Sequence, residues 1–184
     1  MTDRDDDLSS RVDALQVHMV ELHRRLQADL WNDHQRRVSL GDLLQDRWER
    51  ARRYGFGEGS SCYDNVLVLG EVRVGENVWI GPNTVLDGSG GLSIGDYCAI
   101  SAGAQIYSHN SVAWSTSLGQ TAISRAPTRI GNGVYVGPGA IIEMGVTVGD
   151  SAVIGALTLV NRDVPAGSRF YGIPGMAQGP RGPG

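Results

Sequence analysis

The chain has 184 residues, a length that suits one domain with an appendage. Its formal net charge of −4 at pH 7 argues against a general nucleic-acid binder, which would present a basic face. No apolar run approaches the length that spans a bilayer, and the acidic amino terminus lacks the apolar core of a signal peptide. We therefore expect a cytoplasmic protein without membrane insertion, in which Cys62 and Cys98 stay reduced and form no disulfide.

Residues 1–54 are expected to form a helical segment. Its first part shows the alternating four-three spacing of a coiled-coil heptad, carried by Leu8, Val12, Leu15, Met19, Leu22 and Leu26. Two alternatives follow: an amphipathic helix that packs on its own chain, or an oligomerisation helix that associates with copies of itself. A second helical stretch is expected at about 40–53, and a glycine-rich connector at 55–64 follows it.

A six-residue repeat runs, with two interruptions, from Val68 to Ala166. An aliphatic residue recurs every six positions and usually precedes a small or acidic one, as in Val74-Gly75, Ile80-Gly81, Ile100-Ser101, Ile130-Gly131, Val136-Gly137 and Ile154-Gly155. This period fits a short strand plus a tight turn, repeated three times per coil of a β-solenoid. The position four residues further on is small or β-branched, as a second inward side chain of a narrow prism must be. A sandwich of short strands is the alternative, and it predicts turn signals about every eight to twelve residues without fixed phase.

Two places interrupt the repeat. Leu86 and Ile94 are eight residues apart, so the glycine-rich sequence between them should bulge at a corner of the solenoid. Ile106 and Ile130 are 24 residues apart, which preserves the phase while an excursion at 107–129 replaces the regular repeats. A long excursion that returns in register is a loop on a rigid scaffold, and such loops often carry function.

These features resemble the hexapeptide-repeat acyltransferases, over residues 65–175. The resemblance is carried by the aliphatic-Gly-x-x-small-x repeats, by Ile-Ile-Glu-Met-Gly-Val-Thr-Val-Gly-Asp at 141–150 and by the closing segments 160–165 and 171–174. It implies an all-β solenoid, a left-handed parallel β-helix, that follows the N-terminal helical segment. Residues 176–184 are then expected to form a flexible tail.

The resemblance also implies an activity and an assembly. Ile-Tyr-Ser-His followed by Asn-Ser-Val-Ala-Trp, at 106–114, looks like acyltransferases of lipopolysaccharide and sugar-nucleotide pathways. The expected reaction moves an acetyl group from acetyl-CoA to a hydroxyl or amino group of a sugar or nucleotide sugar for cell-surface polysaccharide synthesis. Members of this family pack three prisms side by side, so a homotrimer is expected. An amino-acid acceptor is the enzymatic alternative, and a non-catalytic scaffold or assembly protein is the other.

His109 is the expected catalytic residue. It is the one histidine of the predicted solenoid, and it lies where the regular repeats give way to the excursion. The family places its essential histidine there, and imidazole is suited to accept the proton that an alcohol or amine loses as it attacks a thioester. A zinc site like that of β-helical carbonic anhydrases is the rival. A catalytic zinc needs three protein ligands, so we expect no metal.

The remaining site residues are carried over from the family by position. Acceptor contacts are expected from Asn83, Asp87 and Ser89 of the coil before the histidine. Trp114 is expected to stack on a sugar ring, with covering of the thioester or fixing of the loop as its alternatives. Contacts to the pantetheine arm and nucleotide of the donor are expected from Gly137, Pro138, Ala156, Asn161 and Arg162. Asp87 also fits the small-or-acidic repeat position and could be a turn residue instead. Arg162 could pair with a phosphate, whereas Met176 stands where many relatives have a basic residue.

Overall fold

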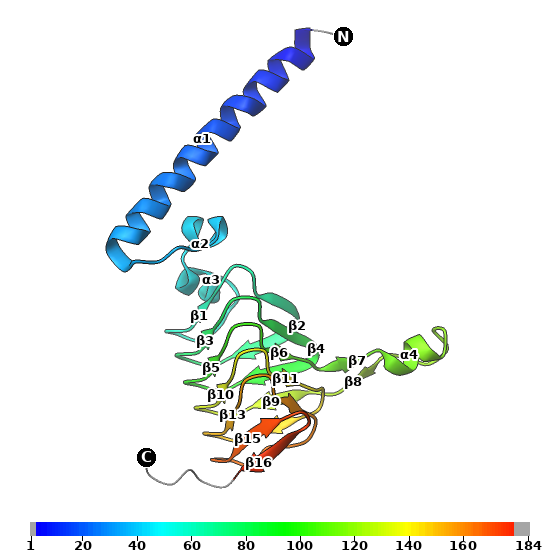
Figure 1. The fold of residues 1–184 in the computed structure, drawn as a ribbon. Coiled ribbons are helices and arrows are strands. Elements are labelled where there is room, and N and C mark those ends of the chain that lie inside the picture. Colours follow the sequence, from blue (N-terminus) through cyan, green and yellow to red (C-terminus); the bar gives the residue numbers. More distant parts are fainter. Residues whose placement is uncertain (1–2, 179–184) are drawn as a thin grey trace. The chain divides into compact units, whose positions relative to one another are not determined.

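The computed structural model describes residues 3–178, and the chain divides into two units, 1–46 and 47–184 (Figure 1). The first unit holds the helices α1 (Asp3–His34) and α2 (Leu40–Leu44). The second unit holds two helices, α3 (Arg47–Arg53) and α4 (Val112–Thr116). It also holds the strands β1 (Ser61–Cys62), β2 (Leu67–Val74), β3 (Trp79–Ile80), β4 (Val85–Ile94), β5 (Ala99–Ile100), β6 (Gln105–Ile106), β7 (His109–Asn110), β8 (Ser124–Arg125), β9 (Thr128–Ile130), β10 (Tyr135–Val136), β11 (Ile141–Ile142), β12 (Thr147–Val148), β13 (Val153–Ile154), β14 (Leu159–Val160), β15 (Arg169–Gly172) and β16 (Gly175–Gln178).

The first unit is a long helix followed by a short one. The side chain of Gln27 donates a hydrogen bond to the carbonyl oxygen of Arg36 at 2.9 Å, which ties the end of α1 to the connector before α2. The predicted heptad side chains stay largely uncovered within this unit, since Leu8 and Leu15 are both 59% exposed. Packing on the same chain and self-association of α1 both stay predictions. None of the helices within residues 3–178 combines the length and apolar character of a membrane span.

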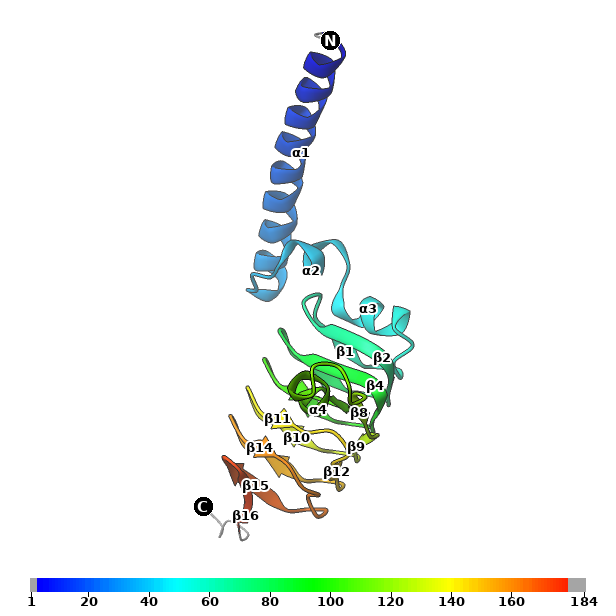
Figure 2. The same cartoon turned by 90° about the vertical axis from the view of Figure 1, so that its right-hand side faces the viewer.

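The second unit is a parallel β-solenoid with three sides. One side has the strand order β1-β3-β5-β10-β13-β15-β16, in which only β16 pairs antiparallel. The long strand β4 spans the other two sides, because its first part pairs with β6 and its second part pairs with β9. The coils therefore stack one upon another along a single axis (Figure 2). The predicted solenoid with a helix before it is confirmed.

Inward side chains form continuous columns through the coils. One column, with at most 3% of any side chain exposed, consists of Cys62, Ile80, Ile100, Val136, Ile154 and Phe170. Burial of one such large side chain contributes about 1.5–3 kcal/mol. The second inward positions hold small or β-branched side chains, all buried: Val78, Thr84, Cys98, Ala104, Val134, Ala140, Val146, Ala152 and Thr158. The repeat pattern therefore identified the second inward set and, except for Cys62 and Phe170 at its two ends, the aliphatic column.

The three sides meet at three corners. We call the turns that follow β3, β5, β10 and β13 the first corner. The turns that follow Leu86 of β4 and the strands β6, β11 and β14 form the second corner, and those that follow β2, β4, β9 and β12 form the third. The predicted bulge lies just beyond Leu86: the pairing of β2 with β4 shifts register between Gly70 and Val72. A Cβ on Gly88 would lie 2.1 Å from the carbonyl oxygen of Glu71, so glycine is required there.

The excursion is a two-stranded ribbon that projects from the second corner, with α4 beyond it (Figure 1). β7 and β8 pair antiparallel, and the chain re-enters the solenoid with Ile130 opposite Ile94. The buried Thr128 hydroxyl donates to the carbonyl oxygen of Tyr107 at 2.6 Å and accepts from the amide of Gly145 at 3.0 Å. Both ends of the excursion are therefore fixed to the scaffold, in the phase that the spacing predicts.

Two strands lie where the sequence analysis expected other structure. β1 falls in the segment expected as a connector, and its Cys62 pairs with Ile80 inside the solenoid. The first coil has no aliphatic-Gly pair at this strand, so the repeat does not reveal it. β16 includes Met176, expected in the flexible tail, because the chain turns back to pair with β15. The rest of that tail, 179–184, lies outside the described residues. Cys62 and Cys98 are both free and buried.

Candidate active site

The second corner brings His109 onto Asp87. Leu86 of β4 and Ile106 of β6 are paired neighbours, so the residue after each lies at the same corner on consecutive coils. Tyr107 therefore stands beside Asp87, and His109 begins β7 two residues later. β8 holds His109 from the other side, because its Arg125 is the antiparallel partner.

The imidazole of His109 is bound to a buried carboxylate. Its Nδ1 lies 2.5 Å from Oδ2 of Asp87, whose side chain has 0% exposure, whereas the His109 side chain is 30% exposed. The same oxygen accepts the backbone amides of Ser108 at 2.9 Å and His109 at 3.1 Å. An ionised carboxylate can only accept hydrogen bonds, so we assign the ring proton to Nδ1. Nε2 is then left with a free lone pair.

The other oxygen of Asp87 is held by Ser89, which lies in the bulge. Oδ1 accepts the Ser89 amide at 3.0 Å and the Ser89 hydroxyl at 2.5 Å. Burial alone would raise the pKa of Asp87, but the hydrogen bonds from Ser89, Ser108 and His109 outweigh burial and lower the pKa from 3.8 to about 2. Asp87 is therefore ionised at neutral pH.

The bulge and the base of the excursion are joined directly. The Ser108 hydroxyl accepts the amide of Gly90 at 2.8 Å, and the Ser108 carbonyl oxygen accepts the amide of Ala126 at 3.0 Å. A Cβ on Gly90 would lie 2.3 Å from that carbonyl oxygen. The amides of Ser89, Gly90, Ser108 and His109 are thus all engaged. Stabilisation of an oxyanion would need other donors.

This arrangement suits proton transfer. An imidazole that donates from Nδ1 to a carboxylate is fixed in one tautomer, and its Nε2 can take a proton from a bound nucleophile. The carboxylate then stabilises the imidazolium that forms. The Tyr107 ring stands edge-on to the His109 ring, with centroids 6.3 Å apart.

The residues expected to contact an acceptor are not all gathered in one place. Asp87 is fully buried, and both of its oxygens are engaged, so its position suits support of His109. Asn83 is exposed at the first corner, where its Oδ1 accepts a hydrogen bond from Asn65 at 2.7 Å. Trp114 lies in α4 and is 47% exposed. Their contacts to an acceptor stay predictions.

The five residues expected to contact the donor fall on two corners. Gly137 and Pro138 follow β10 at the first corner, and the exposed Ala156 follows β13 on the next coil, against Gly137. Asn161 and Arg162 follow β14 at the second corner, the corner of His109. The Arg162 guanidinium donates to the Gly175 carbonyl oxygen at 2.9 Å and lies over the Phe170 ring. In this structure it therefore supports the hairpin of β15 and β16.

Sequence reasoning missed the partners of Asp87. The expected turn role and acceptor role for Asp87 did not include a bond to His109. A signal existed, because residues that follow paired strands lie side by side at one corner, which places Asp87 beside Tyr107. The hydrogen bonds from Ser89, expected as an acceptor contact, to Asp87 were not visible in the sequence, since they depend on how the bulge folds.

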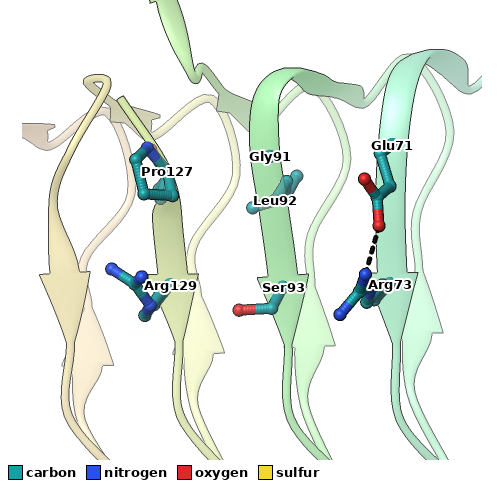
Figure 3. A pocket seen from close by; sticks show the side chains of 8 residues that line it. Glu71, Arg73, Gly91, Leu92, Ser93, Pro127 and Arg129 are labelled. Atoms are coloured by element: carbon teal, nitrogen blue, oxygen red, sulfur yellow. Dashed lines mark hydrogen bonds and ion pairs between the residues drawn. The ribbon is translucent and has the colours of Figure 1, made fainter. Parts of the chain in front are cut away.

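A separate pocket of about 240 Å³ lies on the side formed by β2, the second part of β4 and β9 (Figure 3). Arg73, Ser93 and Arg129, which line it, stand in a row across three neighbouring strands, and Glu71 forms an ion pair with Arg73. His109 is not among its lining residues. Within residues 3–178 no group of three or more His, Cys, Asp or Glu side chains could hold a metal ion.

Two family models match the chain. Residues 71–108 match the hexapeptide repeat of succinyl-transferase, and residues 127–162 match the bacterial transferase hexapeptide of six repeats. A galactoside O-acetyltransferase of Escherichia coli K12 is 31% identical over 56% of this chain and 41% of its own length. Nodulation protein L of Rhizobium meliloti is 36% identical over 59% of each chain. The chain thus spans about half the length of these curated relatives.

Solved structures share the fold. A hexapeptide-repeat acetyltransferase from Vibrio cholerae superposes with a TM-score of 0.64 at 22% identity and covers 91% of both chains. AntD, an N-acyltransferase from Bacillus cereus solved with dTDP and coenzyme A, gives a TM-score of 0.62 at 18% identity, over 69% of this chain and 73% of AntD. The stacked coils, the phase of the repeats and both family models all indicate a solenoid built from hexapeptide repeats. Residues 71–108 and 127–162 of this chain, which lie in the solenoid, are thus similar to hexapeptide-repeat transferases.

Proposed function

We propose that the protein is an acetyl-CoA-dependent acetyltransferase in which His109 is the general base. The observation that carries this proposal is the 2.5 Å contact between His109 Nδ1 and the buried, ionised Asp87. It leaves Nε2 available at the base of an excursion that is fixed to the scaffold. The names of the relatives support the class of reaction, since both the galactoside enzyme and the Vibrio cholerae protein are acetyltransferases.

The reaction follows from these groups. The hydroxyl or amine of the acceptor attacks the carbonyl carbon of the thioester while His109 Nε2 takes its proton. Asp87 stabilises the resulting imidazolium through Nδ1. The tetrahedral intermediate then collapses, the carbon–sulfur bond breaks, and the thiolate of coenzyme A receives the proton that His109 returns. The acetylated acceptor and coenzyme A are the products, and His109 is restored.

A sugar or nucleotide sugar is the proposed acceptor, and cell-surface polysaccharide synthesis in the cytoplasm is the proposed setting. The galactoside relative acts on a sugar by its name, and AntD was solved with a nucleotide, dTDP. An amino-acid acceptor is the second candidate, because a serine acetyltransferase of Synechococcus elongatus is 35% identical over 45% of this chain and 30% of its own length. The galactoside enzyme thus suggests a sugar acceptor, and the serine enzyme suggests an amino-acid acceptor.

We propose that the active unit is a homotrimer, with the donor lying along Ala156. The solenoid side that begins at β1 carries exposed aromatic side chains: Trp79 is 67% and Tyr135 43% exposed, and the two are in register with Ala99 between them. Packing of this side against a copy would bury them, which favours association. It would also close a groove over the first corner, where Ala156 and Leu157 are exposed. A stable monomer at micromolar concentration in sedimentation would contradict this assembly.

The test is release of the coenzyme A thiol. Acetyl-CoA would be incubated with a panel of free sugars, nucleotide sugars and amino acids, and the thiol measured with the wild-type protein. We expect turnover with at least one sugar-type acceptor. Turnover only with amino acids would overturn the acceptor class. No turnover with any acceptor, together with no binding of coenzyme A by calorimetry, would favour a scaffold without catalysis.

A further inference from the structure

Ser89 lies in the bulge of β4 and reaches back to the residue where the bulge begins. Gly70 pairs with Gly88, but Val72 pairs with Leu92, so Glu71 of β2 faces three residues of β4. The two extra residues let the chain double back, and both the amide and the hydroxyl of Ser89 meet Oδ1 of Asp87. A regular coil, which lacks the two extra residues, has no residue that corresponds to Ser89.

The two oxygens of Asp87 have separate tasks. Oδ1 is bound only by Ser89, whereas Oδ2 is bound by the amides of Ser108 and His109 and by the His109 ring, among the residues the structure describes. Ser89 therefore sets the rotation of the carboxylate group. That rotation decides where Oδ2 meets Nδ1 of His109.

The bulge is fixed on its other side as well. The amide of Gly90 donates to the buried Ser108 hydroxyl at 2.8 Å, and any side chain at Gly90 would collide with the Ser108 carbonyl oxygen. The bulge therefore contacts the base of the excursion directly. The side chain of Ser89 itself is exposed, so it is held by its hydrogen bonds and not by surrounding side chains.

We propose that Ser89 is a positioning residue: it holds Oδ1 of Asp87 so that Oδ2 keeps His109 in the single tautomer that leaves Nε2 free. The two-residue bulge is the element that places Ser89 for this purpose. The effect of Ser89 on turnover rests on the proposed acetyltransferase function, whereas its effect on the tautomer of His109 can be measured without that function. Hydrogen bonds from Ser89 also rank among the causes that lower the pKa of Asp87.

The primary test is ring-nitrogen NMR of histidine-labelled protein, which needs no substrate. His109→Ala assigns the signal among the four histidines. In the wild type we expect the proton on Nδ1 of His109, with one ordered signal. Ser89→Ala should give a mixture of tautomers. In this variant Oδ1 of the buried carboxylate loses the Ser89 hydroxyl and keeps only the backbone amide as a donor, so the carboxylate is held less firmly. Ser89→Thr keeps a hydroxyl on an exposed side chain and should restore the ordered signal.

The matched control is Ser93→Ala. Ser93 lies on the same strand beyond the bulge, and its hydroxyl makes no hydrogen bond within the described part of the chain, so its variant should match the wild type. The pH at which the ordered signal disappears in acid is a second readout. Loss of a hydrogen bond to the charged form raises the pKa of Asp87, so Ser89→Ala should lose the signal at higher pH than the wild type. Ser89→Thr should not.

Kinetics complete the test. Turnover of Ser89→Ala should fall on the order of 10-fold, as expected for the loss of one hydrogen bond to a charged group, with the KM for acetyl-CoA and the thermal midpoint unchanged. Ser89→Thr should recover it. A wild type that transfers no acetyl group would defeat the proposed function, and the NMR would still decide the role of Ser89. The role is refuted if Ser89→Ala matches the wild type in tautomer and acid titration, or if Ser89→Thr behaves like Ser89→Ala.

Discussion

The first and second corners of the solenoid are built from the same repeat but differ in what they hold. At the first corner each coil turns in the same way: the amides of Gly81, Ser101, Gly137 and Gly155 donate to the carbonyl oxygens of the next coil at 2.8–2.9 Å. At the second corner two coils depart from the repeat, one by the bulge and one by the excursion. The polar cluster of Asp87, Ser89 and His109 lies at these departures. The regular turns supply rigidity, and the irregular turns supply the reactive groups.

The largest expected effect follows from removal of the imidazole at the second corner. General-base catalysis typically contributes about 10² to 10⁴-fold, so His109→Ala should lower turnover by that order. Binding of acetyl-CoA, measured by calorimetry, should persist. His109→Asn should be similarly impaired, because an amide cannot take the proton. His23→Ala, which removes a histidine of α1, is the control and should keep wild-type turnover.

The next effect comes from neutralising the carboxylate. Asp87→Asn should lower turnover by up to about 10⁴-fold, the loss that this substitution causes where a carboxylate orients a catalytic histidine, because the amide cannot stabilise the imidazolium as a carboxylate does. Asp96→Asn is the matched control at the third corner, where Asp96 Oδ1 accepts the Glu76 amide at 2.8 Å. Equal activity in the two variants would argue against a role for Asp87.

Asp87 should also appear in the acid stability of the fold. The folded pKa is lowered from 3.8 to about 2, so the ionised group stabilises the fold above about pH 4, and this contribution is lost as pH falls towards 2. The unfolding free energy of the wild type should therefore decrease through this window. Asp87→Asn should lack this part of the decrease, which denaturant titrations at several pH values would show.

The contrast between the corners also explains what the sequence could predict. Strict periodicity identified the solenoid, the bulge, the base of the excursion and the inward columns between Val74 and Val160, because each coil repeats the geometry of its neighbour. It also placed His109 at that base. The bond from His109 to Asp87 and the position of Ser89 depend on how two irregular turns fold against each other, and no periodic signal encodes that. The strand β1 was missed because its coil lacks the usual aliphatic-Gly pair.

At the first corner the proposed donor groove should be sensitive to bulk. Ala156→Tyr should raise the KM for acetyl-CoA at least about tenfold, a change that corresponds to 1.4 kcal/mol, with little change in the thermal midpoint because Ala156 is exposed. Ala166→Tyr is the control. Ala166 is also exposed, and its backbone lies against Gly149 at the third corner in the same way as the backbone of Ala156 lies against Gly137 at the first corner. A similar KM in both variants would place the donor elsewhere.

The last expected effect concerns a regular turn, and it is an effect on stability and not on turnover. A Cβ on Gly137 would lie 2.6 Å from the backbone nitrogen of Ala156, so Gly137→Ala forces two coils apart. Overpacking of this kind typically costs about 1–3 kcal/mol. For a chain of this size that lowers the thermal midpoint by roughly 2–4 °C per kcal/mol, which calorimetry would measure. An unchanged midpoint would show that the first corner is less rigid than its backbone hydrogen bonds indicate.

The most direct measurement of the central claim is the pH dependence of acetyl transfer under conditions where chemistry limits the rate. The account predicts that the wild-type rate rises with pH as the imidazole of His109 loses its proton. It predicts that this limb is absent from His109→Ala, whose rate is lower at every pH. A variant that keeps the limb, or that retains more than about a tenth of the wild-type rate, would contradict the assignment of His109 as the base.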